Sequence, residues 1–230
     1  MSELRDNLVR SKHILIIFTV LALIDISQIG FHLYQNNVLE GYENGAYTLE
    51  LIELLDTVSV ALGLLQTLCI VATVVFFIRW FRRAYGNLIR LKVDMEYDES
   101  KAVWGYFIPF INWVRPVKTM KEVYLKTQDT LKNYDSNLIV DDNTGFIVLW
   151  WVMYIINGIV GNYASKVLDK ANTIETFIEA NNAYIVADLV DLASITVAII
   201  VIQKVTKLEI SLKKVDKSVS VIDQIGMTPY

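Results

Sequence analysis

The chain has 230 residues, of which 54% are hydrophobic and 20% are charged, and its mean hydropathy is +0.40. Soluble domains carry about 25% charged residues, so this composition argues against a soluble globular domain. With only 3 Pro and 10 Gly the chain is not of a disordered type, and its single cysteine, Cys69, excludes an intrachain disulfide framework and a cysteine-rich metal site.

Four apolar segments are long enough for membrane-spanning helices, each of which needs about 20 residues. They cover residues 14–33, 54–78, 146–163 and 184–202. Their apolar character is continuous and does not alternate, which favours helices over barrel strands. Residues 14–24 would also suit a signal peptide, but no small-x-small cleavage site follows them, and an uncleaved span is favoured. The sequence therefore predicts an all-α membrane protein with four transmembrane helices in one membrane domain, residues 1–230.

The distribution of Lys and Arg predicts the orientation of these spans. Of the 21 basic residues, 19 lie in the N-terminal segment, in the connection 79–145 and in the C-terminal tail. Residues 35–53 contain none, and residues 164–183 contain two. Because Lys and Arg concentrate in cytoplasmic loops, we expect both termini and the 79–145 connection on the cytoplasmic side. Residues 35–53 and 164–183 are then outer loops.

The inner connection contains a second apolar stretch, residues 103–114, which is too short to span a bilayer. It contains Pro109, which breaks or kinks a helix. An interfacial position and a partly re-entrant one both fit this stretch. Pro116 then suits the first turn of a new helix, and residues 117–131 have the pattern of an amphipathic helix.

A string of residues in this connection resembles a known family. It begins with Trp80-x-Arg82-Arg83-x-x-x-Asn87 and continues as Trp104-Gly105-x-x-x-Pro109-x-x-Asn112-x-x-x-Pro116. This string is similar to that of an uncharacterised family of bacterial multi-pass membrane proteins, catalogued as a domain of unknown function. The resemblance is strongest over residues 75–125 and extends through the fourth span. It implies a bacterial cytoplasmic (inner) membrane protein and assigns no reaction.

Each predicted span carries a polar residue near its middle. Asp25 lies 11 residues from Ile14, which is roughly 16 Å along a helix. Gln66, Asn157 and Asp191 lie 11 or 12 residues from the inner ends of their spans. An ionised carboxylate inside a bilayer is costly, and no Lys or Arg lies in any span, so the acids should face the bundle interior. We predict an intramembrane polar or ion site made of five residues: Asp25, Gln66, Asn157, Asp188 and Asp191.

Two functions from different classes remain open. A structural or accessory subunit of a membrane complex is favoured, because small-residue patterns such as Ser59-x-x-x-Gly63 suit helix packing. A small proton- or cation-coupled transporter or channel that uses Asp25 and Asp191 is the alternative. His32, which lies on the same helical face as Asp25 and Gln28, is a weak candidate for a metal ligand.

Several other classes find no support in the sequence. It shows no zinc-protease, nucleophile-elbow or phosphate-loop motif, so we expect neither an enzyme nor a cofactor. The expected partners are the lipid bilayer and either another protein or further copies of the chain, and no nucleic acid is expected.

Overall fold

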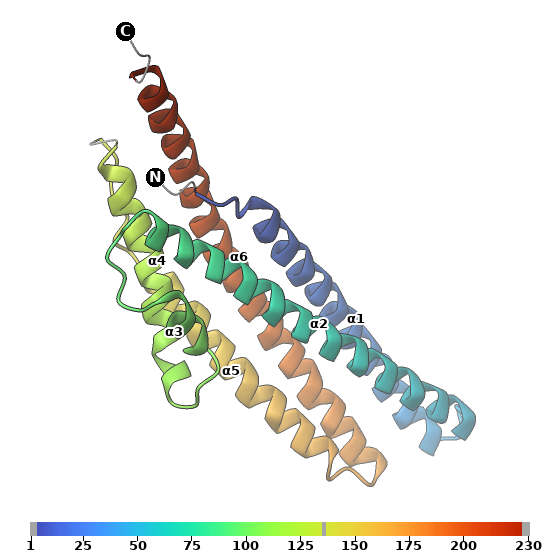
Figure 1. The fold of residues 1–230 in the computed structure, drawn as a ribbon. Helices are drawn as coiled ribbons and strands as arrows, with labels where there is room; N and C mark the ends of the chain where they lie inside the picture. The colour runs from blue at the N-terminus through green and yellow to red at the C-terminus, as the bar shows by residue number, and fades with distance from the viewer. Residues whose placement is uncertain (1–3, 135–136, 227–230) are drawn as a thin grey trace. The chain divides into compact units, whose positions relative to one another are not determined.

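The computed structural model describes residues 4–134 and 137–226, so positions 135 and 136 of the predicted inner connection lie outside the described residues. This part of the chain is all-α and contains no strand (Figure 1). Its elements are α1 (Leu8–Glu43), α2 (Leu49–Arg90), α3 (Glu99–Trp104), the 3-10 turn η1 (Ile111–Trp113), α4 (Arg115–Lys132), α5 (Gly145–Leu168) and α6 (Ile174–Gly226).

Four of these helices, α1, α2, α5 and α6, are long and apolar enough to cross a membrane. Each contains one of the four predicted spans. Their apolar side chains are mostly exposed: only 6% of the most apolar window of α2 is buried, and 39% of that of α6. Such a surface needs lipid around it, because exposed apolar area of this extent is not stable in water. The chain is therefore an all-α, multi-pass membrane protein.

The helices extend beyond the predicted spans. α1 continues to Glu43 and α6 begins at Ile174. The predicted outer loops 35–53 and 164–183 are therefore reduced to connections of residues 44–48 and 169–173. The hydropathy signal ends where polar side chains begin, whereas a helix continues as long as its backbone hydrogen bonds are made. The first connection turns at Gly45, whose φ of 73° lies in the left-handed region.

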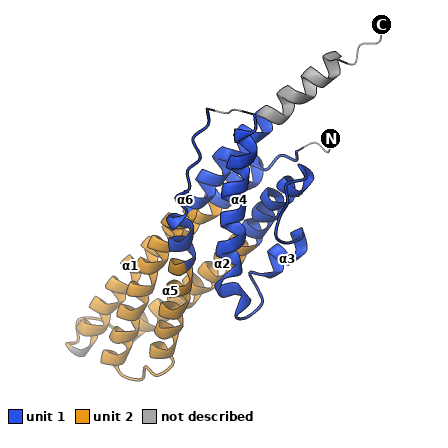
Figure 2. Ribbon diagram, turned by 90° about the vertical axis from the view of Figure 1, so that its left-hand side faces the viewer, with its two compact units in different colours: residues 1–15, 75–151, 199–230 blue, residues 16–74, 152–198 orange. Residues whose placement is uncertain are grey.

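The chain divides into two compact units, which Figure 2 shows in two colours. Unit 2 comprises residues 16–74 and 152–198, that is, segments of α1, α2, α5 and α6. Unit 1 comprises residues 1–15, 75–151 and 199–230, and it includes α3, η1 and α4.

Unit 1 has a dense aromatic and aliphatic core. Trp80, Phe81 and Tyr85 on α2 are fully buried, and Met120 on α4 is buried with them. The predicted amphipathic helix is α4, and Pro116 lies in its first turn as expected. The apolar face of α4 is buried within the unit and does not lie exposed, since Val123 is also only 1% exposed.

Candidate functional site

Gln66 joins three helices of unit 2 through one side-chain amide. Its Nε2 donates to Asp25 Oδ1 on α1 at 2.9 Å and to Asp188 Oδ1 on α6 at 3.3 Å. Both acids are buried, with 0% and 3% of their surface exposed. The depth argument from the sequence expects Asp25 and Gln66 at one level, and the structure places the two side chains in direct contact.

The fourth long helix reaches the same place through Asn157. Its Nδ2 donates to Asp191 Oδ1 at 2.7 Å, and the Asp191 carboxyl group neighbours that of Asp25. Asp191 follows Asp188 by three residues, so the two lie on adjacent turns of one face of α6. We call Asp25, Asp188 and Asp191 the carboxyl cluster, and Gln66 and Asn157 are its amide donors.

The carboxyl cluster is acidic and uncompensated among the described residues. The hydrogen bonds to it come from neutral amides, and Oδ2 of Asp25 and Oδ2 of Asp188 are buried without a hydrogen-bond partner. Adjacent negative charges repel strongly in a medium of low dielectric constant. Three ionised carboxylates cannot share such a place, so the arrangement can take up protons or a cation.

His32, the weak metal candidate, is not grouped with the carboxyl cluster as a ligand set. Within residues 4–134 and 137–226 no three His, Cys, Asp or Glu side chains are positioned to hold a metal ion. The His32 ring instead stacks on Tyr184 of α6, with the ring centroids 5.6 Å apart and the planes 16° from parallel. It is 7% exposed, and its Nδ1 has no hydrogen-bond partner.

A column of buried polar side chains continues along α1 from the carboxyl cluster. Gln28 Nε2 donates to the carbonyl oxygen of Leu62 on α2 at 3.4 Å. About one turn beyond His32, Gln35 Nε2 donates to Asp56 Oδ1 at 3.1 Å, and Asn36 exchanges hydrogen bonds with α6. We call the residues Gln28, His32, Gln35 and Asn36, with their partners Asp56, Asn181, Asn182 and Tyr184, the polar column.

Sequence reasoning found only the start of this column. Gln35, Asn36 and Asn181 lay outside the predicted spans and were placed in the polar outer loops. The signal that could have found them is their spacing: Asp25, Gln28, His32, Gln35 and Asn36 all fall on one face of a continuous helix.

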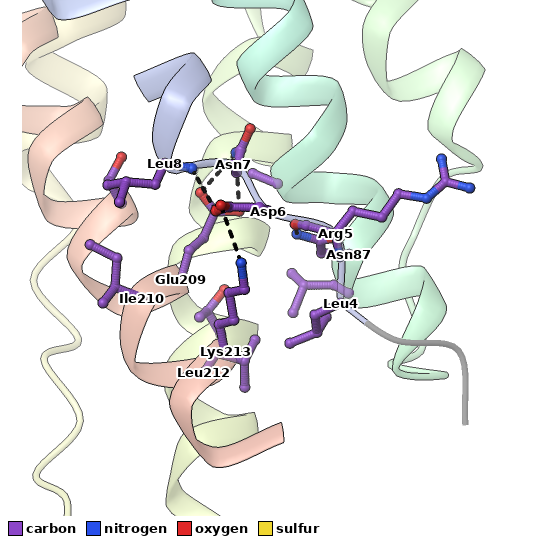
Figure 3. A pocket seen from close by; sticks show the side chains of 14 residues that line it. Leu4, Arg5, Asp6, Asn7, Leu8, Asn87, Glu209, Ile210, Leu212 and Lys213 are labelled. Atoms are coloured by element: carbon purple, nitrogen blue, oxygen red, sulfur yellow. Dashed lines mark hydrogen bonds and ion pairs between the residues drawn. The ribbon is translucent and has the colours of Figure 1, made fainter. Parts of the chain in front are cut away.

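In unit 1, Asn87 of the family-like string binds the segment that precedes α1. Its Oδ1 accepts from the Arg5 amide at 3.2 Å, and its Nδ2 donates to the Arg5 carbonyl at 2.9 Å. Next to it, Asn7 Nδ2 donates to both oxygens of Glu209 on α6, at 3.1 and 2.9 Å. Figure 3 shows these side chains around a pocket of about 30 Å³, which is the size of a water molecule and not of a substrate.

The N-terminal segment has two further ties within this unit. The Asp6 carboxylate accepts from the Leu8 amide at 3.1 Å, which caps α1, and it pairs with Lys213 at 3.2 Å. These interactions, the Leu8 hydrogen bond first, lower the pKa of Asp6. The segment before α1 is therefore fixed to α2 and α6 by polar contacts.

The other members of the string on α2 have structural positions. The Trp80 ring is fully buried, and its backbone carbonyl accepts from Asn7 Nδ2 at 3.1 Å. Arg82 pairs with Glu99 at the start of α3, while Arg83 is half-buried. None of these side chains lies in the carboxyl cluster.

Gly105 is required by the close approach of Arg115. A Cβ at position 105 would lie 2.1 Å from Cδ and 2.6 Å from Cγ of that side chain. The Arg115 guanidinium then stacks over the ring of Tyr97, 4.6 Å from its centroid. Gly105 thus allows the start of α4 to fold back onto the α3 segment.

Asn112 is fixed through its backbone and not through its side chain. Its carbonyl oxygen accepts from Trp151 Nε1 of α5 at 2.8 Å, whereas its buried Oδ1 has no partner. Pro109 is exposed before a turn in which Phe110 adopts a φ of 63°. An interfacial or re-entrant position of this stretch stays a prediction. Its exposed apolar side chains are Trp104, Phe107, Ile108, Phe110, Trp113 and Val114.

Comparison with known proteins gives one match. The model of the family described as "Domain of unknown function (DUF4328)" matches residues 44–207, more than two thirds of the chain. No curated protein and no solved structure matches. The matched range includes Gln66, Asn157, Asp188 and Asp191 together with the whole string from Trp80 to Pro116, whereas α1 with Asp25 precedes it. The chain, a multi-pass membrane protein, belongs to the DUF4328 family.

Proposed function

We propose that this membrane protein is a small proton-coupled transporter or channel in which the carboxyl cluster binds the transported protons. The single observation that carries this proposal is the grouping of three carboxyl groups from α1 and α6, two of them buried and Asp191 half-buried, without any basic partner among the described residues. Intramembrane acids that face a bundle interior are typical of proton and ion pathways.

The chemistry of the neighbouring amides favours protons over a metal cation. Gln66 and Asn157 both present N–H groups to the carboxyl oxygens. A cation in the cluster would be coordinated by amide oxygens and repelled by these N–H dipoles. A shared proton between neighbouring carboxyl groups reduces their repulsion and leaves the amide bonds intact.

A role in packing alone does not explain the residue types. Asn or Gln at positions 25, 188 and 191 could make the same interhelical hydrogen bonds without the free-energy penalty of a buried charge. Three neighbouring carboxyl groups, two of which share the Gln66 amide, therefore favour a function that uses their ionisation.

The orientation follows from the charges. We place the protein in the bacterial cytoplasmic membrane with both termini inside, because 19 of the 21 Lys and Arg residues lie on one side of the spans. In a variant without Cys69, single cysteines at Asn44 and Asn172 should react with an impermeant thiol reagent from outside intact cells, and one at Asn133 should not. Reaction at Asn133 alone would reverse the assignment.

The proposal is tested by proton flux in proteoliposomes that contain a pH-sensitive dye. A potassium gradient with valinomycin sets the membrane potential, and the wild-type protein should acidify the lumen faster than protein-free vesicles. Asp25→Asn and Asp191→Asn should abolish this difference, whereas Asp142→Asn, a change at an exposed acid, should not. A wild-type flux equal to that of empty vesicles, or an undiminished flux in Asp25→Asn, would contradict the proposal.

A second candidate is an accessory subunit of a membrane complex or a homo-oligomer. The observation in its favour is that a Cβ at Gly63 or Gly161 would meet no atom within 4 Å, so these small-residue positions are not used for packing against the described residues. Small residues of this kind let another transmembrane helix approach closely. Affinity purification from the native membrane should then yield a stoichiometric partner or a defined oligomer.

A further inference from the structure

We infer that, in the conformation described, protons exchange between the carboxyl cluster and solvent through the polar column, from the end of unit 2 that carries the α1–α2 and α5–α6 connections; release at the other end then requires a second conformation. The identity of the transported ion, a proton, rests on the proposed function. The existence of a water-lined path from this end rests on separate observations. Its residues and their neighbours all lie within residues 16–74 and 152–198.

The first observation is the polarity of the buried face of α1. From Asp25 towards the connection, the buried residues of α1 include Gln28, Gln35 and Asn36, at 4%, 7% and 9% exposure. Polar side chains are rarely buried unless they are paired. Four such groups in succession along one helix, with His32 among them, mark a path about 16 Å long at 1.5 Å per residue.

The second observation is that this path carries every unpaired buried side-chain atom found in the described part of unit 2. Beside Oδ2 of Asp25 and Oδ2 of Asp188, these atoms are Nδ1 of His32 and Oε1 of Gln35. Buried polar atoms that lack a protein partner are usually satisfied by internal water. Their alignment between the carboxyl cluster and the connections therefore indicates a chain of water molecules.

The third observation is the contrast between the two ends. At the connection end, Asp56 and Asn182 are exposed while their partners Gln35 and Asn36 are buried, so the column meets solvent at these two side chains, before the buried face of α1 becomes apolar at Val38 and Leu39. In the other direction the buried face of α1 becomes apolar at Leu21 and Phe18, and α6 presents Ile195 and Ala198 beyond a single buried hydroxyl group, that of Ser194. Apolar side chains do not pass a proton, so the path towards this end is closed in the conformation described.

Among the residues of the polar column, the His32 ring is a group that can itself accept and release a proton. The stack on Tyr184 fixes the plane of its ring, and its unpaired Nδ1 is buried within the column. The titratable side chains along the path are Asp56 on α2, Tyr184 on α6 and the carboxyl cluster, and no Lys or Arg lies among them.

Cysteine reactivity tests the path without any assumption about transport. In a Cys69→Ser background, Gln28→Cys, His32→Cys and Gln35→Cys are compared with Leu21→Cys, which is equally buried but lies on the apolar side. A small, charged, water-soluble thiol reagent is added to proteoliposomes from the connection side. Because only a hydrated thiolate reacts, the column cysteines should react at least about tenfold faster than the one at position 21. Equal rates at positions 21 and 32 would overturn the inference.

Radiolytic hydroxyl footprinting of the wild-type protein provides a second measurement that needs no variant. His32 should be oxidised faster than Phe18, an aromatic residue of comparable burial on the apolar side, because radicals form from neighbouring water. No difference between these residues would contradict a hydrated column. Hydration with no proton flux would contradict the proposed function alone, and flux without hydration would contradict this inference alone.

Discussion

At the scale of single residues, two substitutions of Asp25 distinguish the contribution of its hydrogen bond from that of its ionisation. In Asp25→Asn the new side-chain oxygen can still accept from Gln66 Nε2, so the protein should fold with nearly unchanged stability. In Asp25→Leu that buried donor loses a partner, and the free energy of unfolding should fall by about 1–3 kcal/mol. Reversible unfolding in mixed micelles measures both variants, with Leu23→Ala at an exposed lipid-facing position as control. Equal stability of the Leu and Asn variants would show that the bond contributes nothing.

That these polar residues come together could be predicted from the sequence, but which amide pairs with which acid could not. A helix has a fixed rise per residue, so counting from the span ends brings Asp25, Gln66, Asn157 and Asp191 to one level. That Gln66 bonds Asp188 as well as Asp25 depends on the rotation of α2 and α6 about their axes. Rotation is set by the packing of neighbouring helices, which hydropathy does not report.

At the scale of elements, two glycines make a matched pair. Gly105→Ala should destabilise unit 1 by about 1–3 kcal/mol, because the added Cβ would overlap the Arg115 side chain at the start of α4. Gly63→Ala, in the middle of α2 with open space around it, should leave the fold intact or stabilise the helix by up to about 1 kcal/mol. Thermal unfolding of both variants checks this, and the reverse order of stabilities would refute the close approach.

The segment before α5 is held to α4 by one titratable contact. Tyr124 Oη donates to Asp141 Oδ2 at 2.8 Å, and this bond lowers the pKa of Asp141 below its ordinary value. A lowered carboxyl pKa contributes stability that is present above the ordinary pKa and is lost as the pH falls through the lowered one. Tyr124→Phe should raise the pKa of Asp141 towards its ordinary value, measured by carbon-13 NMR of labelled aspartate. Tyr134→Phe, at an exposed position, is the control, and an unchanged Asp141 pKa in Tyr124→Phe would exclude the contact.

The four membrane-spanning helices could be predicted from the sequence for a physical reason, but that reason does not fix the residues at which the helices end. Apolar length identifies a span because lipid cannot satisfy backbone groups outside a helix. The ends of α1 and α6 could not be placed, since Gln35, Asn36 and Asn181 read as loop residues although they are buried in polar contacts between helices. Likewise, the packing of α4 within unit 1 depends on long-range contacts that its amphipathic pattern leaves open.

At the scale of the whole molecule, the four long helices combine exposed apolar side chains with buried polar ones. The outer faces of α1, α2, α5 and α6 are apolar and exposed, while their inward polar groups meet in the carboxyl cluster. Membrane proteins that only anchor or pack do not need ionisable groups there. The central claim is therefore that the cluster takes up and releases protons inside the bilayer.

Isotope-edited infrared spectroscopy of the full-length protein in lipid bilayers tests that claim most directly. With carbon-13-labelled aspartate, the carbonyl stretch of protonated carboxyl groups is followed from about pH 5 to about pH 9, the range in which buried carboxyl groups titrate. The wild-type protein should show a protonated aspartate band that fades as the pH rises, and Asp25→Asn and Asp188→Asn should each reduce it. A wild-type spectrum without such a band, or one identical to that of Asp25→Asn at every pH, would contradict the account.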